Sequence, residues 1–291
     1  MIDLATTRSP IGLDLFVAAL LLALLSLGSA AHAVTIELKG AAPDRIERQK
    51  QAAIGHLPLP GTPNISQRAE RLNQKDLVFG SPIMIRIFKE ESELEIWMRR
   101  GTVFVHFATY PVCNWSGGLG PKLKEGDKQA PEGFYTITRR RLRHSGRWPR
   151  SLNLGFPNVL DRSLARTGSY ILVHGGCTSV GCFAMTNSVI DEIYELTEAA
   201  IKGGQKNVPL HVLPFRMTKK NLKRHAGSPW IEFWKNLKQG YDSFERTHLP
   251  PQIDVCQDRY YVHDAASSQE GAKRPTNQCG ETAALIKDRA M

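Results

Sequence analysis

The chain has 291 residues, a formal net charge of +10 and 42% hydrophobic residues. This length and composition fit one large globular domain or two small ones, and exclude a chain too short or too polar to bury a core. The positive charge favours contact with polyanions, although charge alone does not choose among cell-wall polymers, lipid headgroups and nucleic acid.

The N-terminus has the pattern of a secretion signal. Arg8 precedes an apolar run from Leu15 to Leu27, and the A-x-A pattern of a signal-peptidase site follows at Ala31–Ala33. We therefore predict a signal peptide over residues 1–33. An uncleaved anchor is the alternative, although the run is shorter than the roughly 20 residues of a spanning helix. Either way we expect an exported protein of the periplasm or cell envelope that meets the membrane only through this segment.

The next segments predict a lead-in and a β-meander. Residues 34–78 are polar and lack sustained periodicity, which indicates a tether or a partly helical lead-in. Apolar residues then alternate with period two in two runs, which predicts a hairpin. The alternating residues are Ile83, Ile85 and Ile87, then Leu94, Ile96 and Met98. A third β-rich run over residues 102–109 completes the meander.

A long Gly- and Pro-marked loop over residues 113–133 precedes a predicted strand over residues 134–138. Loops of this size inside a domain are usually functional. The following run, Arg139–Arg150, is the most basic of the chain, yet no recognisable nucleic-acid-binding module surrounds it. We interpret it as a solvated basic loop and expect no nucleic-acid partner.

The stretch Ser169–Met185 combines several features of a cysteine nucleophile site. Five strand-favouring residues end on His174, a glycine-rich turn presents Cys177 and Cys182, and a helical pattern then begins. The helix is marked by apolar residues at helical spacing, namely Val189, Ile193, Leu196 and Ala200. Ser188 with Asp191 resembles its capping box.

A last predicted strand at residues 210–213 closes the core domain near residue 217. Beyond it, Ser228 is a predicted N-cap with Pro229 at the first helical position, and an aromatic stripe from Trp230 to Tyr241 is interpreted as core packing. The polar residues 263–291 are predicted to form a flexible tail.

Five cysteines in an exported chain leave at least one unpaired unless pairing is intermolecular. Cys256 can pair with Cys279, and Cys113 with Cys177, which leaves Cys182 as the free thiol. The rival pairing of Cys177 with Cys182 would remove the nucleophile.

A thiolate is the attacking species, and an ordinary thiol is mostly protonated at neutral pH. His174 as a base, a nearby helix start and the Ser179-Val-Gly181 turn all favour Cys182 over Cys177 as the nucleophile. A buried structural role for His174 remains open. A zinc site with both cysteines is a further alternative, but no fourth ligand is evident nearby and an oxidising compartment disfavours it, so we expect no metal or cofactor.

Several runs occur in an order that resembles a known family. Ala130–Tyr135, Val173–Gly175 and Ser179–Cys182 resemble the TPxGxF, IHG and SHGC motifs of the YkuD-type L,D-transpeptidases. Runs similar to the YafK-type branch are also present in order: Trp115–Leu123, Asn153–Asn158, Arg166–Tyr170, Cys182–Thr186 and Pro214–Thr218. The chain departs from the wider family at Val180 and at Phe183-Ala184, as the branch does, which leaves substrate and acceptor open.

The resemblance, which extends from Phe79 to Phe244, implies a mainly β fold with peripheral helices (α+β). The expected architecture is a β-sandwich or barrel-like L,D-transpeptidase domain over residues 79–217, with a helical extension over residues 218–262.

The resemblance also implies roles for single residues. Cys182 matches the nucleophile, His174 the general acid/base, and Gly175 the position whose carbonyl orients the histidine, while Ser179 and Gly181 match the turn beneath the nucleophile. Arg166, with Arg162 and Arg216 as alternatives, is a candidate either for holding the substrate carboxylate or for a structural ion pair.

The implied substrates are peptidoglycan stem peptides, and the implied role is in cell-wall biogenesis, remodelling and cell shape. Two outcomes of the implied thioester are open, namely transfer to an amine such as a wall-attached protein lysine, and hydrolysis by an amidase that releases protein from diaminopimelate. A non-catalytic cell-wall-binding protein is the alternative from another class.

Overall fold

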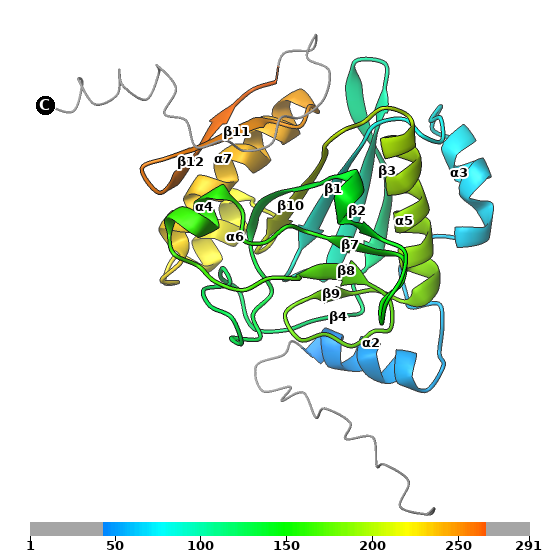
Figure 1. The fold of residues 1–291 in the computed structure, drawn as a ribbon, viewed down its shortest axis with the longest axis horizontal. Helices are drawn as coiled ribbons and strands as arrows, with labels where there is room; N and C mark the ends of the chain where they lie inside the picture. The colour runs from blue at the N-terminus through cyan, green and yellow to red at the C-terminus, as the bar shows by residue number, and fades with distance from the viewer. Residues whose placement is uncertain (1–42, 266–291) are drawn as a thin grey trace, which may run out of the picture. The chain divides into compact units, whose positions relative to one another are not determined.

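The computed structural model describes residues 43–265 (Figure 1). The predicted signal peptide, the start of the lead-in and residues 266–291 of the predicted tail lie outside this range. Two open five-stranded sheets, a two-stranded sheet and several helices make up the described chain. The predicted fold of sheets with peripheral helices (α+β) is therefore confirmed, whereas the barrel-like alternative is wrong, because the sheets of the described residues do not close into a barrel.

The first sheet contains the predicted meander. Its strands β1 (Ile83–Phe88), β2 (Glu93–Arg100) and β3 (Val103–Pro111) pair in antiparallel order. On the other side of β1, β10 (Val208–Leu213) pairs in parallel, and β5 (Gly133–Ile137) then pairs antiparallel to β10. The alternation of apolar residues was sufficient to predict the meander because its pairings are local.

The second sheet has the order β4-β9-β8-β7-β6 and is built from very short strands. They are β4 (Asn114–Trp115), β6 (Leu142–Arg143), β7 (Ser151–Asn153), β8 (Leu172–His174) and β9 (Phe183–Ala184). Only β8 and β9 pair in parallel; the neighbouring pairs are antiparallel. This sheet holds His174 at the end of β8.

One hydrophobic core lies between elements of both sheets and the helix α5 (Asn187–Lys202). Members of the cluster come from β1, β8 and β9, and the predicted stripe of α5 is buried in it. The predicted capping box is wrong: Thr186 is the N-cap of α5 and makes no side-chain capping bond, and Ser188 lies inside the helix.

The C-terminal extension covers the outer face of the first sheet. It contains α6 (Lys219–Arg224), α7 (Ile231–Thr247) and a hairpin of β11 (Gln252–Cys256) and β12 (Arg259–His263). Phe88 of β1 belongs to a second apolar cluster with Trp234 and Leu237 of α7, which confirms the core interpretation of the aromatic stripe. Ser228 is not the N-cap as predicted, since Trp230 takes that position and Ser228 Oγ accepts its N–H.

The remaining helices are short. The segment before β1 forms α2 (Pro43–Ala53), the 3₁₀ turn η1 (Ile65–Gln67) and α3 (Arg68–Asn73). The 3₁₀ turn η2 (Arg139–Arg141) precedes β6, and α4 (Val159–Ser163) follows β7. Within residues 43–265, no helix has the length and apolar character needed to span a membrane.

A buried ion pair fixes the long loop between β4 and β5. Lys89 and Glu132 are both 0% exposed, and their side chains meet at 2.9 Å. Lys89 Nζ also donates to the carbonyls of Gly120 and Ala130, while Glu132 accepts from the Trp234 indole N–H at 2.8 Å. The loop, the first sheet and α7 are therefore joined by one hydrogen-bonded network.

Candidate functional site

His174 ends β8 and is held by two contacts. Its Nδ1 donates to the Gly175 carbonyl at 2.6 Å, and the Trp148 indole stacks on its ring with centroids 4.4 Å apart. The side chain is only 2% exposed. Because Nδ1–H is used in this bond, the neutral ring carries its lone pair on Nε2, where it can accept a proton.

Cys182 lies one residue before β9. The parallel register places Val173 opposite Phe183, and continuing it places Leu172 opposite Cys182. The Leu172 N–H donates to Cys182 Sγ at 3.4 Å, so the thiol contacts the backbone of β8 at Leu172. Leu172 lies two residues before His174 on β8, so this contact places the thiol two residues along the strand from the imidazole.

A disulfide ties the turn between these two residues to the segment that connects β3 of the first sheet to β4 of the second. Cys113 is bonded to Cys177, and Cys182 is a free cysteine. The predicted pairing is confirmed, and the rival pairing of Cys177 with Cys182 is wrong. Because its sulfur is in a disulfide, Cys177 is available neither as a nucleophile nor as a zinc ligand. The predicted pairing of Cys256 involves a residue outside the described range.

The N–H groups of the turn are mostly engaged. Ser179 Oγ accepts the Cys182 N–H at 3.0 Å and donates to the Cys182 carbonyl at 2.6 Å. The Gly181 N–H donates to Ser116 Oγ. The N–H groups of Gly181 and Cys182 therefore each bind a serine hydroxyl in this state, whereas the Val180 N–H has no acceptor among residues 43–265.

Ser116 had no role in the sequence-based prediction. It directly follows β4, and the pairing of β4 with β9 brings it beneath the turn. Its position in the Trp115–Leu123 run was the only signal in the sequence, and that run did not indicate which side chain would reach Gly181. Arg45 of α2 supports the same segment, since it donates to the Trp115 carbonyl at 2.5 Å.

Burial shifts both titratable groups toward their neutral forms. Desolvation lowers the pKa of His174, opposed by the bond to the Gly175 carbonyl and helped by the charge of Arg147. Desolvation raises the pKa of Cys182, opposed by the Leu172 N–H and the charge of Lys122. The resting pair at neutral pH is thus a neutral thiol and a neutral imidazole.

Arg166 is engaged elsewhere. Its Nη1 lies 2.9 Å from Asp161 Oδ1, and its guanidinium lies over the Phe233 ring at 5.1 Å. Both side chains of the ion pair are buried, and Asp161 also caps α4. Within the described range Arg166 has no contact with His174 or Cys182, which favours the structural reading of this residue. Arg216 likewise pairs with carboxylates of β2.

The basic run Arg139–Arg150 does more than the predicted solvated loop. It forms η2, β6 and the connection from β6 to β7, and its Trp148 covers the His174 ring. Gly176, at φ +88°, makes room for this indole, because a Cβ there would lie 2.4 Å from it. Nothing in the spacing of the run predicted the approach to His174.

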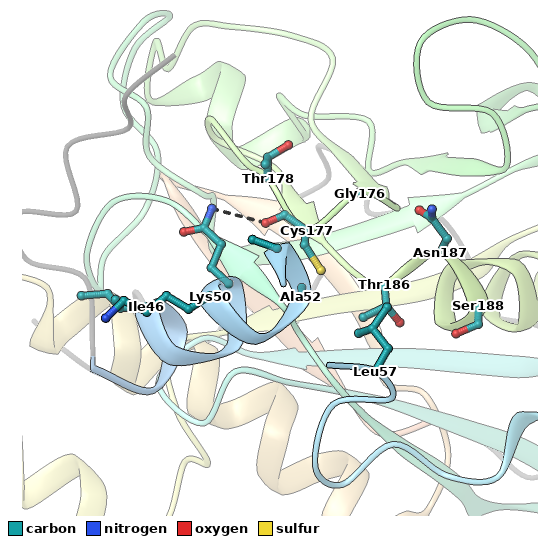
Figure 2. A pocket seen from close by; sticks show the side chains of 12 residues that line it. Ile46, Lys50, Ala52, Leu57, Gly176, Cys177, Thr178, Thr186, Asn187 and Ser188 are labelled. Carbon is teal, nitrogen blue, oxygen red and sulfur yellow. Dashed lines mark hydrogen bonds between the residues drawn. The ribbon is translucent and has the colours of Figure 1, made fainter. Parts of the chain in front are cut away.

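A pocket of about 720 Å³ lies beside the turn (Figure 2). Cys177 and Thr178 line it together with residues of α2 and the start of α5, and Gln49 of α2 donates to the Cys177 carbonyl at 3.4 Å. Neither His174 nor Cys182 is among the residues that line this pocket.

Comparisons with known proteins show the family of the chain. The family model of the YkuD L,D-transpeptidase catalytic domain matches residues 82–203. The Escherichia coli (strain K12) protein named "Putative L,D-transpeptidase YafK" is 44% identical over 195 residues, which cover 67% of this chain and 79% of that protein. The O157:H7 strain has a protein of the same name with the same identity and coverage.

Solved structures give weaker likenesses. The helical cell shape determining protein Pgp2 from Campylobacter jejuni aligns with a TM-score of 0.38 and 19% identity over 62% of this chain and 67% of that one. Bd1075 from Bdellovibrio bacteriovorus aligns with a TM-score of 0.33 and 21% identity over 56% and 60% of the two chains.

Proposed function

Because the chain belongs to the family of YkuD L,D-transpeptidase catalytic domains, we propose that it catalyses cysteine acyl transfer on peptidoglycan stem peptides. In this proposal Cys182 is the nucleophile and His174 is the general acid/base. The observation that carries it is the arrangement on the second sheet: a free thiol bound by the Leu172 N–H lies two residues along β8 from a carbonyl-oriented imidazole.

The first half of the reaction forms a thioester. Nε2 of His174 takes the proton from Cys182 Sγ as sulfur attacks the carbonyl carbon of a stem-peptide amide. The tetrahedral intermediate collapses with cleavage of the C–N bond, and His174 gives the proton to the leaving amine. The acyl group remains on Cys182, and no cofactor takes part.

The oxyanion of the intermediate needs N–H donors in the turn. The Val180 N–H is one donor, since it has no acceptor among the described residues. The N–H groups of Gly181 and Cys182 become further donors when they exchange the hydroxyls of Ser116 and Ser179 for the oxyanion. In this proposal the two serine hydroxyls accept the N–H groups of Gly181 and Cys182 whenever no substrate is bound.

The second half resolves the thioester with an amine or with water. An amine acceptor, such as a second stem or a wall-attached protein lysine, gives transpeptidation. The surroundings of Cys182 favour hydrolysis as the second candidate, because Val180 and Tyr170 beside it are each 50% exposed and leave a path for water.

The proposed location is the periplasm or cell envelope. The N-terminal pattern supports export, and so does the Cys113–Cys177 disulfide, because disulfides persist in oxidising compartments. In this setting the enzyme acts in cell-wall remodelling.

The test is the action of purified protein on sacculi, followed by mass spectrometry of the released muropeptides. Wild type should change the profile and Cys182→Ala should not, while His174→Gln should slow the change by about 10²–10⁴-fold through loss of general acid/base catalysis. The mass of the wild-type protein should increase by that of the acyl group on Cys182, and the mass of the Cys182→Ala protein should not. His56→Gln, an exposed histidine outside the site, is the matched control.

Equal changes with wild type and Cys182→Ala would refute the catalytic proposal. Binding of both proteins to sacculi with no change in either profile would favour the alternative of a wall-binding protein.

A further inference from the structure

The connection between β6 and β7 has unused positive charge beside the proposed catalytic pair. We call residues 142–153, which comprise β6, β7 and the loop between them, the basic hairpin. The β7 strand pairs with β8, so the basic hairpin is the neighbour of the strand that ends in His174. Its arginines must therefore be sorted into those that hold the hairpin and those that do not.

Three contacts anchor the basic hairpin. The Tyr194 hydroxyl and His144 Nδ1 are 2.6 Å apart, which joins the loop to α5. Arg150 lies 3.3 Å from carboxylate oxygens of α5, on Asp191 and Glu195. Stacking of Trp148 on His174 fixes the third point. With these anchors the loop is held over the site.

Arg143 and Arg147 take no part in the anchoring. The Arg143 guanidinium lies over the Tyr170 ring at 4.6 Å, and that of Arg147 lies over its neighbour Trp148 at 5.2 Å. In the part of the chain that the structure describes, no carboxylate forms an ion pair with either. Both charges remain free to bind an anion.

The two aromatic residues beneath these guanidiniums contact the proposed catalytic pair directly. Trp148 covers the His174 ring, and the Tyr170 carbonyl lies 3.9 Å from Cys182 Sγ, within reach of the thiol proton. Arg147 therefore lies over Trp148, the residue that contacts His174. Arg143 lies over Tyr170, the residue that contacts Cys182.

We propose that Arg143 and Arg147 bind a carboxylate of the acyl-donor peptide, so that the site selects donors with a free carboxylate near the scissile amide. A guanidinium matches a carboxylate through two parallel N–H bonds, and aromatic stacking orients its plane. The half-exposed Tyr170 and Val180 supply apolar surface for the aliphatic parts of the same donor. This inference rests on the proposed function and specifies its substrate.

Binding to the Cys182→Ala protein tests the inference without turnover. The probes are a synthetic stem tetrapeptide with free carboxylates and the same peptide with each carboxylate converted to a carboxamide, and calorimetry gives Kd. We expect the carboxylate form to bind at least about tenfold more tightly, as for hydrogen bonds between charged groups. The preference should fall as salt is raised.

Single variants then locate the preference. Arg143→Gln and Arg147→Gln should each weaken binding of the carboxylate peptide by about tenfold and leave the carboxamide peptide within about twofold, and the double variant should remove the preference. Arg147→Lys keeps the charge without the planar fork and should restore part of it. Arg140→Gln is the matched control, because the substitution removes the same charge. Arg140 is exposed and lies outside the basic hairpin.

Equal Kd values for the two peptides, or a preference that survives in the double variant, would overturn the inference. Equal losses in Arg140→Gln would do so too, because they would indicate a general effect of net charge. A retained preference in a protein without Cys182-dependent turnover would refute the catalytic proposal and leave the carboxylate site standing.

Discussion

Removal of the Cys113–Cys177 disulfide tests how much stability comes from tying the turn to the segment between β3 and β4. The perturbation is a double replacement of both cysteines by alanine in a Cys182→Ala background, which prevents thiol exchange. The bonded residues are 64 positions apart. Loop-closure entropy for a loop of this length predicts a loss of about 4 kcal/mol in the free energy of unfolding.

Urea unfolding followed by tryptophan fluorescence measures this loss. With a slope of roughly 2–3 kcal/mol per molar urea for a domain of this size, the midpoint should fall by about 1.3–2 M. The matched control is the Cys182→Ala protein with the disulfide intact. A loss below about 1 kcal/mol would refute the reasoning, because the loop would then be restrained in the unfolded chain by something other than this bond.

Four further outcomes follow from the structure. The kcat/KM of the wild type should fall on the acid side with an apparent pKa below 6.5, because burial lowers the pKa of His174 and only its neutral form accepts a proton. The rate at which iodoacetamide labels Cys182 should still be rising at pH 9, because burial raises the pKa of the thiol. Lys89→Met should lower the free energy of unfolding by about 3–5 kcal/mol, measured by urea unfolding, since it leaves Glu132 buried without its cation. The reasoning would be contradicted if Lys89→Met alone cost less free energy of unfolding than the double variant that also carries Glu132→Leu. Ser116→Ala should cost about 1–2 kcal/mol in the same assay by leaving the Gly181 N–H without its acceptor, and an unchanged midpoint would show that the bond is dispensable.

Local patterns predicted the elements whose pairing is local. Alternating apolar residues located β1, β2 and β3, and a stripe at helical spacing located α5. The strands β4, β6 and β9 are each two residues long, which is too short for an alternation of apolar and polar residues to be recognised. Their geometry is set by partners distant in the chain, such as Trp115 opposite Phe183.

The same distinction applies to the site. His174, Cys182 and the turn between them are close in sequence. Cysteine arithmetic in a chain expected to be exported left two pairings of Cys177 open, and the fold selects the one with Cys113. Ser116 and Trp148 reach the turn from other segments, so only the folded sheet brings them there. Their side chains carry no pattern that distinguishes them from other loop residues.

Because the resting pair is neutral, the basic hairpin would also affect the proton transfer from Cys182 to His174. Attack requires a thiolate and an imidazolium. Burial is the main cause that lowers the pKa of His174, and the positive charge of Arg147 adds to it. A donor carboxylate bound at Arg147 would offset that charge and make the imidazolium less costly at the moment when the thiol loses its proton. Binding of the correct donor would then assist the proton transfer as well as position the amide, whereas a donor without the carboxylate would leave the pair neutral. Selectivity and activation would thus depend on the same guanidinium.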